Sequence, residues 1–226
     1  MLRIESLRAL RGQASENAGV RTALLRQVES GPGDAKDGNT QFEIDEQLVL
    51  ALADVDDGDR PSLQSLRARV QRERPATLDA WLTRLGKEGD AAAGRRIFHH
   101  PKAGHCSRCH RADGRGCTIA SDLTAVGRSA SRRSLIESII DPDKTVPGPY
   151  VSWVLVTNSG KVHSGVIVSE DSESVVVGTG DGRLTRLRRE QIVSRHSQRN
   201  SLMPGNLATQ LTVGEFRDLL AFLCHY

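Results

Sequence analysis

Apolar residues recur every three or four positions through the first 88 residues, which is the spacing of helices that bury one face. We expect short helices there, around residues 2–10, 20–28, 42–55, 63–70 and 78–85. A polar loop that begins at Gly31-Pro32 separates the first two helices from the others. Ser62 and Thr77 precede the last two helices and are expected to cap them, because a hydroxyl accepts the free amide hydrogens of a first turn.

Helical spacing returns between residues 90 and 140 and again at the C-terminus. The expected N-caps are polar residues that each precede an apolar run, namely Asp90, Ser131 and Thr212. Asp141-Pro142 ends the helix that follows Ser131, because the residue before a proline avoids the helical conformation. We also expect the helix after Asp90 to cross the last helix at Gly94, where a missing side chain lets two backbones approach, with Phe98 packed alongside.

Residues 150–197 have a different pattern, with short β-branched runs between turn residues such as Asn158-Ser159-Gly160. The expected strands are Val151–Thr157, Val162–Val168, Val175–Thr179, Arg183–Leu187 and a short strand at Ile192-Val193. Isolated hairpins are only marginally stable, so these strands predict a small barrel or a curled antiparallel sheet.

Together the patterns predict a mainly α protein with a small antiparallel β unit inserted at residues 150–197. Residues 1–88 form one helical segment, whose paired short helices resemble a HEAT-like remnant without a clean repeat period. Residues 89–226 form a second domain that carries the insert. A hydrophobic content of 38% and a charged content of 26% fit a soluble protein with modest cores. The chain has no apolar run long enough to span a membrane.

Cys106-Ser107-Arg108-Cys109-His110 is the most informative segment of the chain. Two thiols three positions apart can each add to one vinyl group of a haem, and the next residue then places an imidazole under the iron. With four cysteines and seven histidines in 226 residues, the pattern arises by chance about 0.002 times. We therefore expect one covalent haem c, anchored by Cys106 and Cys109, with His110 as an iron ligand.

Two other interpretations of these thiols are a zinc site and a thioredoxin-like redox pair. Zinc would need a second pair of ligands, whereas Cys117 and Cys224 stand alone in the sequence. A redox pair belongs in a βαβ setting, whereas the residues around the motif are polar and typical of loops. The sequence leaves open whether Cys117 and Cys224 are free or paired with each other.

Iron bound by His110 has a second axial position, for which Met203 is the expected ligand. The chain has two methionines, and the other is the start residue Met1. A soft thioether favours ferrous iron and suits electron transfer. The alternatives are that Met203 fills a gap in the core and that His163 or His196 ligates instead. Because axial ligands bind opposite faces of the haem, the β insert must leave and return on one side of it.

The order of these motifs resembles class I cytochrome c and, more narrowly, the planctomycete-type haem-binding domain. The resemblance covers about residues 88–226. Its segments are Gly94 with Phe98, Cys106–His110, Gly114-x-Gly116, Asp122-Leu123-Thr124, residues 135–142, Tyr150, residues 157–160, Gly165, residues 201–204 and residues 218–223. The resemblance implies class I cytochrome c-like helices around the haem. It also implies a C-terminal module of a longer secreted protein, which accounts for the missing signal peptide.

One departure from that family lies just after the haem motif. The family tends to have Gly-Pro before the Asp-Leu pair, but here Ala120-Ser121 precedes Asp122-Leu123. A proline carbonyl commonly accepts the N–H of the ligating histidine in such cytochromes, and that bond orients the ring. Another carbonyl must take this role here.

We predict that the protein is a c-type cytochrome that transfers one electron. It is expected to be an electron-transfer domain of a larger dehydrogenase-like protein rather than an enzyme, because no residue is needed for bond chemistry. One alternative is a haem-based sensor in which a small ligand displaces Met203. A second is a peroxidase-like enzyme, for which no distal acid–base pair can be assigned. A third makes the β insert a carbohydrate or protein interaction module.

Haem c is normally attached outside the cytoplasm, so a periplasmic or other extracytoplasmic location is expected. Residues 1–90 carry 13 basic against 16 acidic side chains, and residues 91–226 carry 18 against 12. We attribute the basic excess to solubility and to compensation of the haem propionates, although it could also steer an acidic redox partner. The expected partner is a redox protein or an upstream dehydrogenase-like domain. Nucleic acid is not expected, because the arginine-rich residues 186–189 lack interleaved aromatics. The sequence does not specify an oligomeric state.

Overall fold

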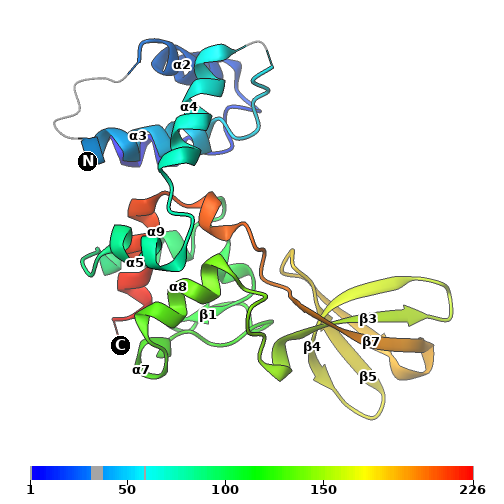
Figure 1. The fold of residues 1–226 in the computed structure, drawn as a ribbon. Helices are drawn as coiled ribbons and strands as arrows, with labels where there is room; N and C mark the ends of the chain where they lie inside the picture. Colours follow the sequence, from blue (N-terminus) through cyan, green and yellow to red (C-terminus); the bar gives the residue numbers. More distant parts are fainter. Residues whose placement is uncertain (1, 32–37, 59, 226) are drawn as a thin grey trace. The chain divides into compact units, whose positions relative to one another are not determined.

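The computed structural model describes residues 2–31, 38–58 and 60–225, which form two compact units (Figure 1). The first unit comprises Met1–Leu85 and Gln210–Phe216, and the second comprises Gly86–Thr209 and Arg217–Tyr226. Helix α9 (Val213–Leu223) contributes to both units. The division near residue 85 lies close to the expected boundary at residue 88, but the sequence does not predict that residues 210–216 belong with the N-terminal helices.

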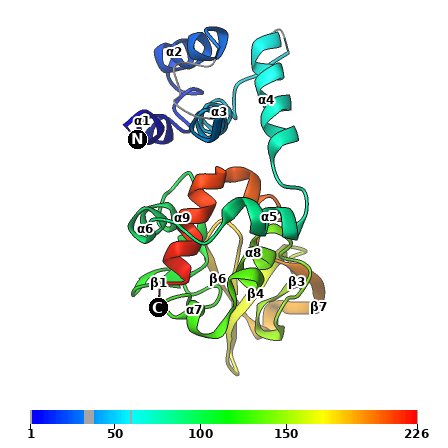
Figure 2. The ribbon, with the colours of Figure 1, turned by 60° about the vertical axis from the view of Figure 1, so that its left-hand side comes forward.

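The first unit also contains the helices α1 (Leu2–Ala9), α2 (Ala18–Glu29), α3 (Gly38–Ala51), α4 (Pro61–Glu73) and α5 (Leu78–Leu85), so the helical prediction is confirmed. Helix α3 packs against α1 and α4 (Figure 2). The expected loop after Gly31 lies largely outside the described residues. Thr77 caps α5 as predicted, because its Oγ1 accepts the Ala80 N–H at 3.2 Å. The Ser62 prediction is wrong: α4 begins at Pro61, which has no amide hydrogen to satisfy, and no side chain caps it.

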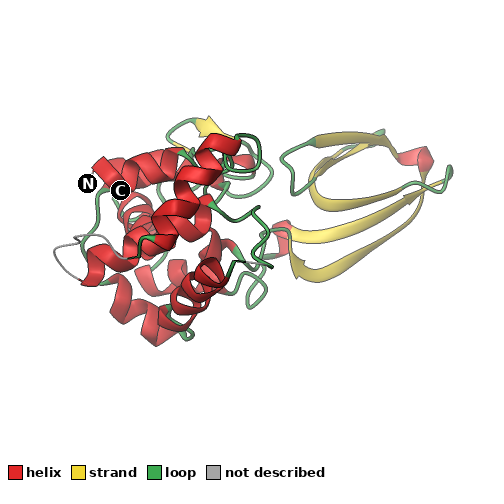
Figure 3. Cartoon of the chain, turned by 90° about the horizontal axis from the view of Figure 1, so that it is seen from above, coloured by secondary structure: helices red, strands yellow, loops and turns green. Residues whose placement is uncertain are grey.

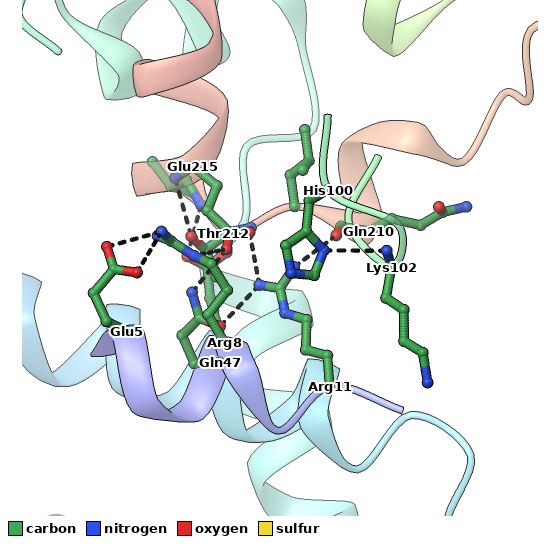
Figure 4. A network of polar contacts seen from close by, with 12 residues as sticks. Glu5, Arg8, Arg11, Gln47, His100, Lys102, Gln210, Thr212 and Glu215 are labelled. Atoms are coloured by element: carbon green, nitrogen blue, oxygen red, sulfur yellow. Dashed lines mark hydrogen bonds and ion pairs between the residues drawn. The ribbon is translucent and has the colours of Figure 1, made fainter. Parts of the chain in front are cut away.

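A buried charge network joins residues 210–216 to the N-terminal helices of this unit (Figure 4). The fully buried Glu215 carboxylate accepts hydrogen bonds from Arg8 Nε at 2.6 Å, Arg11 Nη2 at 2.6 Å and Gln47 Nε2 at 3.0 Å. Burial alone would raise the pKa of Glu215. The positive charges of Arg11 and Arg8, together with hydrogen bonds from the Thr212 backbone and the Gln47 side chain, hold this pKa below its ordinary value. Thr212 Oγ1 accepts the Glu215 N–H at 3.1 Å, which confirms Thr212 as the N-cap of α9.

The helices of the second unit, apart from α9, are α6 (Ala91–Phe98), α7 (Val126–Ser129), α8 (Arg132–Ile140) and the 3₁₀ turns η1 (Cys106–Arg108), η2 (Gly148–Tyr150), η3 (Arg189–Gln191) and η4 (Leu207–Gln210). Both predicted caps are confirmed. The Asp90 carboxylate accepts the N–H groups of Ala92 and Ala93, and the Ser131 hydroxyl accepts the N–H of Ser134. Helix α8 ends at Ile140, as Asp141-Pro142 predicts.

Helices α6 and α9 approach closely at Gly94, as expected. A Cβ added to Gly94 would lie 1.9 Å from the Asp218 carbonyl oxygen and 2.8 Å from the Phe222 Cβ. The Phe98 and Phe222 rings lie 5.6 Å apart between their centroids. Only glycine therefore fits this contact, and the paired rings fill the space beside it.

The strands of the second unit form a hairpin of β1 (Arg111–Ala112) and β2 (Arg115–Gly116) and a five-stranded antiparallel sheet. The strands of the sheet are β3 (Val151–Thr157), β4 (Val162–Glu170), β5 (Ser174–Gly178), β6 (Leu184–Arg188) and β7 (Ile192–Ser201), in the spatial order β6-β5-β4-β3-β7. The sheet curls (Figure 3) and buries Leu155, Val175, Val177 and Leu187 on one face. In the described residues no pairing joins β6 to β7, so the curled sheet forms rather than the barrel.

The predicted fold class, mainly α with a small β insert, is wrong. The last strand, β7, has ten residues where the sequence predicts a short strand at Ile192-Val193, and β4 extends to Glu170. Together with the β1–β2 hairpin, the sheet makes this an α and β protein in which helices and antiparallel strands are segregated. Residues of β7 are mostly exposed, so this strand is held by backbone pairing with β3 and carries little hydrophobic signal.

The sheet begins and ends at one place. Val151, the first residue of β3, pairs with Ser201, the last residue of β7. The chain therefore leaves the helical part of the second unit and returns to it side by side. This places the Met203 loop directly after the sheet, and the position of the strands relative to a haem stays a prediction.

Candidate haem site

Cys106, Cys109 and His110 are brought together by one tight turn. The turn begins after Gly104 and His105, which both have positive φ angles of 64° and 54°. The Cys106 carbonyl accepts the N–H of Cys109 at 3.2 Å and the N–H of His110 at 2.9 Å. Side chains three positions apart eclipse each other in a 3₁₀ turn, so the two thiols lie on one side of η1.

The His110 ring is oriented by a backbone carbonyl. His110 Nδ1 lies 2.9 Å from the Ser121 carbonyl oxygen, which can only accept, so the ring carries its proton on Nδ1. Nε2 is then the lone-pair nitrogen of a neutral imidazole, the form that ligates metals. Burial lowers the pKa of His110, against the opposing effect of the Ser121 carbonyl, and this favours the neutral ring. Ser121 stands where the resembling family tends to have proline, and its carbonyl thus orients the His110 ring in place of a proline carbonyl.

All four cysteines, which lie in the described residues, are free thiols, so Cys117 and Cys224 are not paired with each other. Burial raises the pKa of the Cys106 thiol to about 12. Burial also raises the pKa of Cys109, with a further contribution from the nearby Cys117. The Cys117 N–H donates to the Ser107 carbonyl at 3.1 Å, which places Cys117 beside the turn of residues 106–110, the predicted attachment turn.

Met203 lies in the loop that follows β7, in the same unit as His110. Its N–H donates to Ser201 Oγ at 3.1 Å, and the Ser201 N–H donates to the Asp143 carboxylate at 2.6 Å. The Met203 side chain is half-buried. These contacts fix the start of the loop, and ligation by Met203 stays a prediction. Met1, the other methionine, lies outside the described residues.

The two histidines considered as alternative ligands lie in the sheet. His163 on β4 pairs with Leu155, and His196 on β7 pairs with Val154. Because neighbouring positions of β3 point to opposite faces, these histidines lie on opposite faces of the sheet. His196 is exposed and His163 is half-buried.

The turn between β5 and β6 is a part of the site that the sequence does not reveal. A Cβ added to Gly182 would lie 3.1 Å from the Arg108 carbonyl oxygen, within the attachment turn. A Cβ added to Gly180 would lie 3.8 Å from Leu202 Cδ1, next to Met203. The glycines of Gly180-Asp181-Gly182 signal a tight turn in the sequence, but they do not show what the turn packs against.

Among residues 2–31, 38–58 and 60–225, no group of three or more His, Cys, Asp and Glu side chains could hold a metal ion. Within the same ranges, no helix combines the length and the apolar character needed to cross a membrane.

The first unit contains a cavity of about 110 Å³ between α2, α3 and α4. Apolar side chains such as Val28, Ile44 and Leu66 line it together with the ion pair between Asp45 and Arg69. None of the residues predicted to bind haem lines this cavity.

In comparisons with known proteins, the sequence matches no protein-family model and no curated protein.

Proposed function

We propose that this chain is a c-type cytochrome module that transfers single electrons through one covalently attached haem. The observation that carries the proposal is the hydrogen bond from His110 Nδ1 to the Ser121 carbonyl, directly after a turn that aligns two free thiols. This bond leaves Nε2 as a preoriented ligand, and orientation by a backbone carbonyl is typical of histidines that bind metals. The resemblance to the planctomycete-type haem-binding domain supports the same proposal.

Cys106 and Cys109 would anchor the cofactor. Each thiol would form one thioether bond to a vinyl group of the haem, an addition that needs no oxidant. His110 and Met203 would be the protein ligands of the iron. A bound haem would supply one-electron chemistry, and its potential would be raised by the thioether of Met203.

The chain's own residues are assigned to binding and orientation and not to bond chemistry, so we propose an electron-transfer role rather than an enzymatic one. The electron donor would be an upstream dehydrogenase-like domain or a separate redox protein. Haem c is normally attached outside the cytoplasm, so we propose that the protein is located in the periplasm or another extracytoplasmic compartment.

Mass spectrometry of the denatured chain tests the proposal directly. The protein should be produced in a host that exports it and carries the machinery for c-type haem attachment. The wild type is expected to gain the mass of one haem that survives acid–acetone extraction. The double variant Cys106→Ala/Cys109→Ala should lose the covalent haem, whereas Cys224→Ala, at a cysteine outside the motif, should attach haem like the wild type.

An apo mass for the wild type under these conditions, or a stoichiometric zinc ion, overturns the proposal. Equal haem loss in Cys224→Ala and in the double variant would also contradict it, because the effect would then not be specific to the motif.

A further inference from the structure

The turn that joins β5 to β6, Thr179–Arg183, is internally braced. The Gly182 N–H donates to the Thr179 carbonyl and the Thr179 N–H donates to the Arg183 carbonyl, both at 2.9 Å. The Asp181 carboxylate accepts the Thr179 hydroxyl and forms an ion pair with Arg183 at 3.2 Å. Gly182 has a φ angle of 83°, which side chains rarely tolerate. The turn is therefore a rigid projection from the sheet.

This projection touches the attachment turn between the two haem cysteines. Gly182 faces the Arg108 backbone so closely that an added Cβ would lie 3.1 Å from the carbonyl oxygen and 3.5 Å from the Arg108 Cβ. Arg108 lies between Cys106 and Cys109.

The same hairpin also touches the segments that position the two proposed iron ligands. A Cβ on Gly178, the last residue of β5, would lie 2.7 Å from the Ile119 side chain. Ile119 precedes by two positions the Ser121 carbonyl that orients His110. A Cβ added to Gly180 would lie 3.8 Å from Leu202 Cδ1, so Gly180 lies beside the residue before Met203.

We propose that the β5–β6 turn positions both axial ligands and that the sheet is a working part of the haem site. The proposal rests on the haem function proposed above. Gly182 lies against the attachment turn and Gly180 lies beside the Met203 loop, so the turn is placed to hold their separation. A displaced turn would weaken the bond from Met203 to iron without removing either thioether anchor.

The glycines of two hairpin turns provide a matched experiment. Gly182→Val introduces both strain at a positive φ and a clash with Arg108. Gly160→Val, in the β3–β4 turn, introduces strain at a φ of 79° but has no atom within 4 Å of its added Cβ. Both variants should lose thermal stability. Only Gly182→Val should also lose the sulfur-to-iron charge-transfer band near the red edge of the oxidised spectrum.

Carbon monoxide binding to the reduced protein gives a second readout. A ligand binds more weakly when a smaller fraction of the protein is competent to bind it. Here the competent fraction is the fraction with Met203 displaced from the iron. We expect Gly182→Val to bind carbon monoxide at least tenfold more tightly than the wild type, and Gly160→Val to bind it like the wild type. If Gly182→Val does not fold, Leu202→Ala removes the side chain that lies beside Gly180 without strain in the turn, and the same changes are expected.

The outcomes separate this inference from the proposed function. A wild type without covalent haem overturns the function, and the inference falls with it. A wild type that carries haem but lacks the charge-transfer band overturns the inference and the ligation by Met203, whereas the covalent haem attachment of the proposed function still stands. The inference also fails if the band and the affinity for carbon monoxide are unchanged in Leu202→Ala, or in a folded Gly182→Val compared with Gly160→Val.

Discussion

At the scale of single residues, the site depends on backbone groups that a sequence does not display. Ala120-Ser121 departs from the Gly-Pro of the resembling family, yet the Ser121 carbonyl lies 2.9 Å from His110 Nδ1. A carbonyl does not depend on which side chain its residue carries, so the hydrogen bond survives the departure. The motif residues could be proposed as haem-binding residues from their side chains alone, and that role stays a prediction, whereas the partner of His110 needed the structure.

Met203→Ala tests the least constrained residue of the proposed site. If Met203 ligates iron, its loss should remove the charge-transfer band, open the iron to carbon monoxide and lower the reduction potential, because a soft sulfur favours ferrous iron. Optical spectra and a redox titration of the purified protein measure all three. Met203→His should also lower the potential but keep the iron low-spin.

The sensor interpretation predicts a different wild type. A missing charge-transfer band together with ready binding of carbon monoxide in the unmodified protein would mean an open iron. Sensing would then explain the site better than electron transfer.

At the scale of elements, the crossing of α6 and α9 makes a sharp prediction. Gly94→Val should lower the free energy of unfolding by about 1–3 kcal/mol or more, because overpacking costs that much even where side chains can yield. Here the added carbon would meet the Asp218 carbonyl at 1.9 Å, and a backbone yields less easily. Thermal unfolding followed by circular dichroism gives the measurement.

Gly148→Val is the control for that substitution, because no atom lies within 4 Å of its added Cβ and its φ is not positive. Its melting temperature should stay near that of the wild type. Equal melting temperatures for Gly94→Val and the wild type would mean that the two helices do not meet as described.

An element could be predicted from the sequence where neighbouring residues specify it, and not where pairing with a distant strand does. Asp90, Ser131 and Thr212 could be predicted as caps because a polar side chain before an apolar run has one common local use. Ser62 failed because Pro61 takes the first helical position. Strand β7 was underestimated because its residues are mostly exposed and show no alternation, so pairing with β3 decides its length.

At the scale of the whole molecule, the membership of residues 210–216 was beyond sequence reasoning. Glu215 binds Arg8 and Arg11, which precede it by more than 200 positions. No local sequence pattern predicts such a contact. A polar residue of a helix, here Glu215 of α9, therefore gives no sign in the sequence that it is the centre of a buried network. Loss of one partner would leave a buried charge uncompensated, so this network is expected to be sensitive to mutation.

The same unit contains a carboxyl group that should make stability depend on pH. Burial raises the pKa of Glu46 from 4.5 to about 7, and Glu43 and Glu215 act in the same direction. Arg74 at 3.3 Å and the Val213 N–H at 2.8 Å oppose this increase without overcoming it. Between pH 4.5 and 7 the folded protein therefore holds a proton that the unfolded chain has released.

Stability should accordingly fall as pH rises through that window, by an amount on the order of 3 kcal/mol for this group. Glu46→Gln mimics the protonated carboxyl and removes the dependence. Denaturant unfolding should show the variant close to the wild type at pH 5 and more stable than it at pH 8. Glu215, whose pKa is lowered, acts with the opposite sign, because its stabilisation is lost as pH falls below its ordinary value.

The exposed Glu29→Gln provides the matched control, since it removes one carboxylate from the same unit without touching the network. Its difference from the wild type should be equal at pH 5 and pH 8. If Glu46→Gln behaves like Glu29→Gln, the ion pair with Arg74 keeps Glu46 charged in the folded protein. The network would then be fully ionised, and acid would destabilise it through both carboxylates.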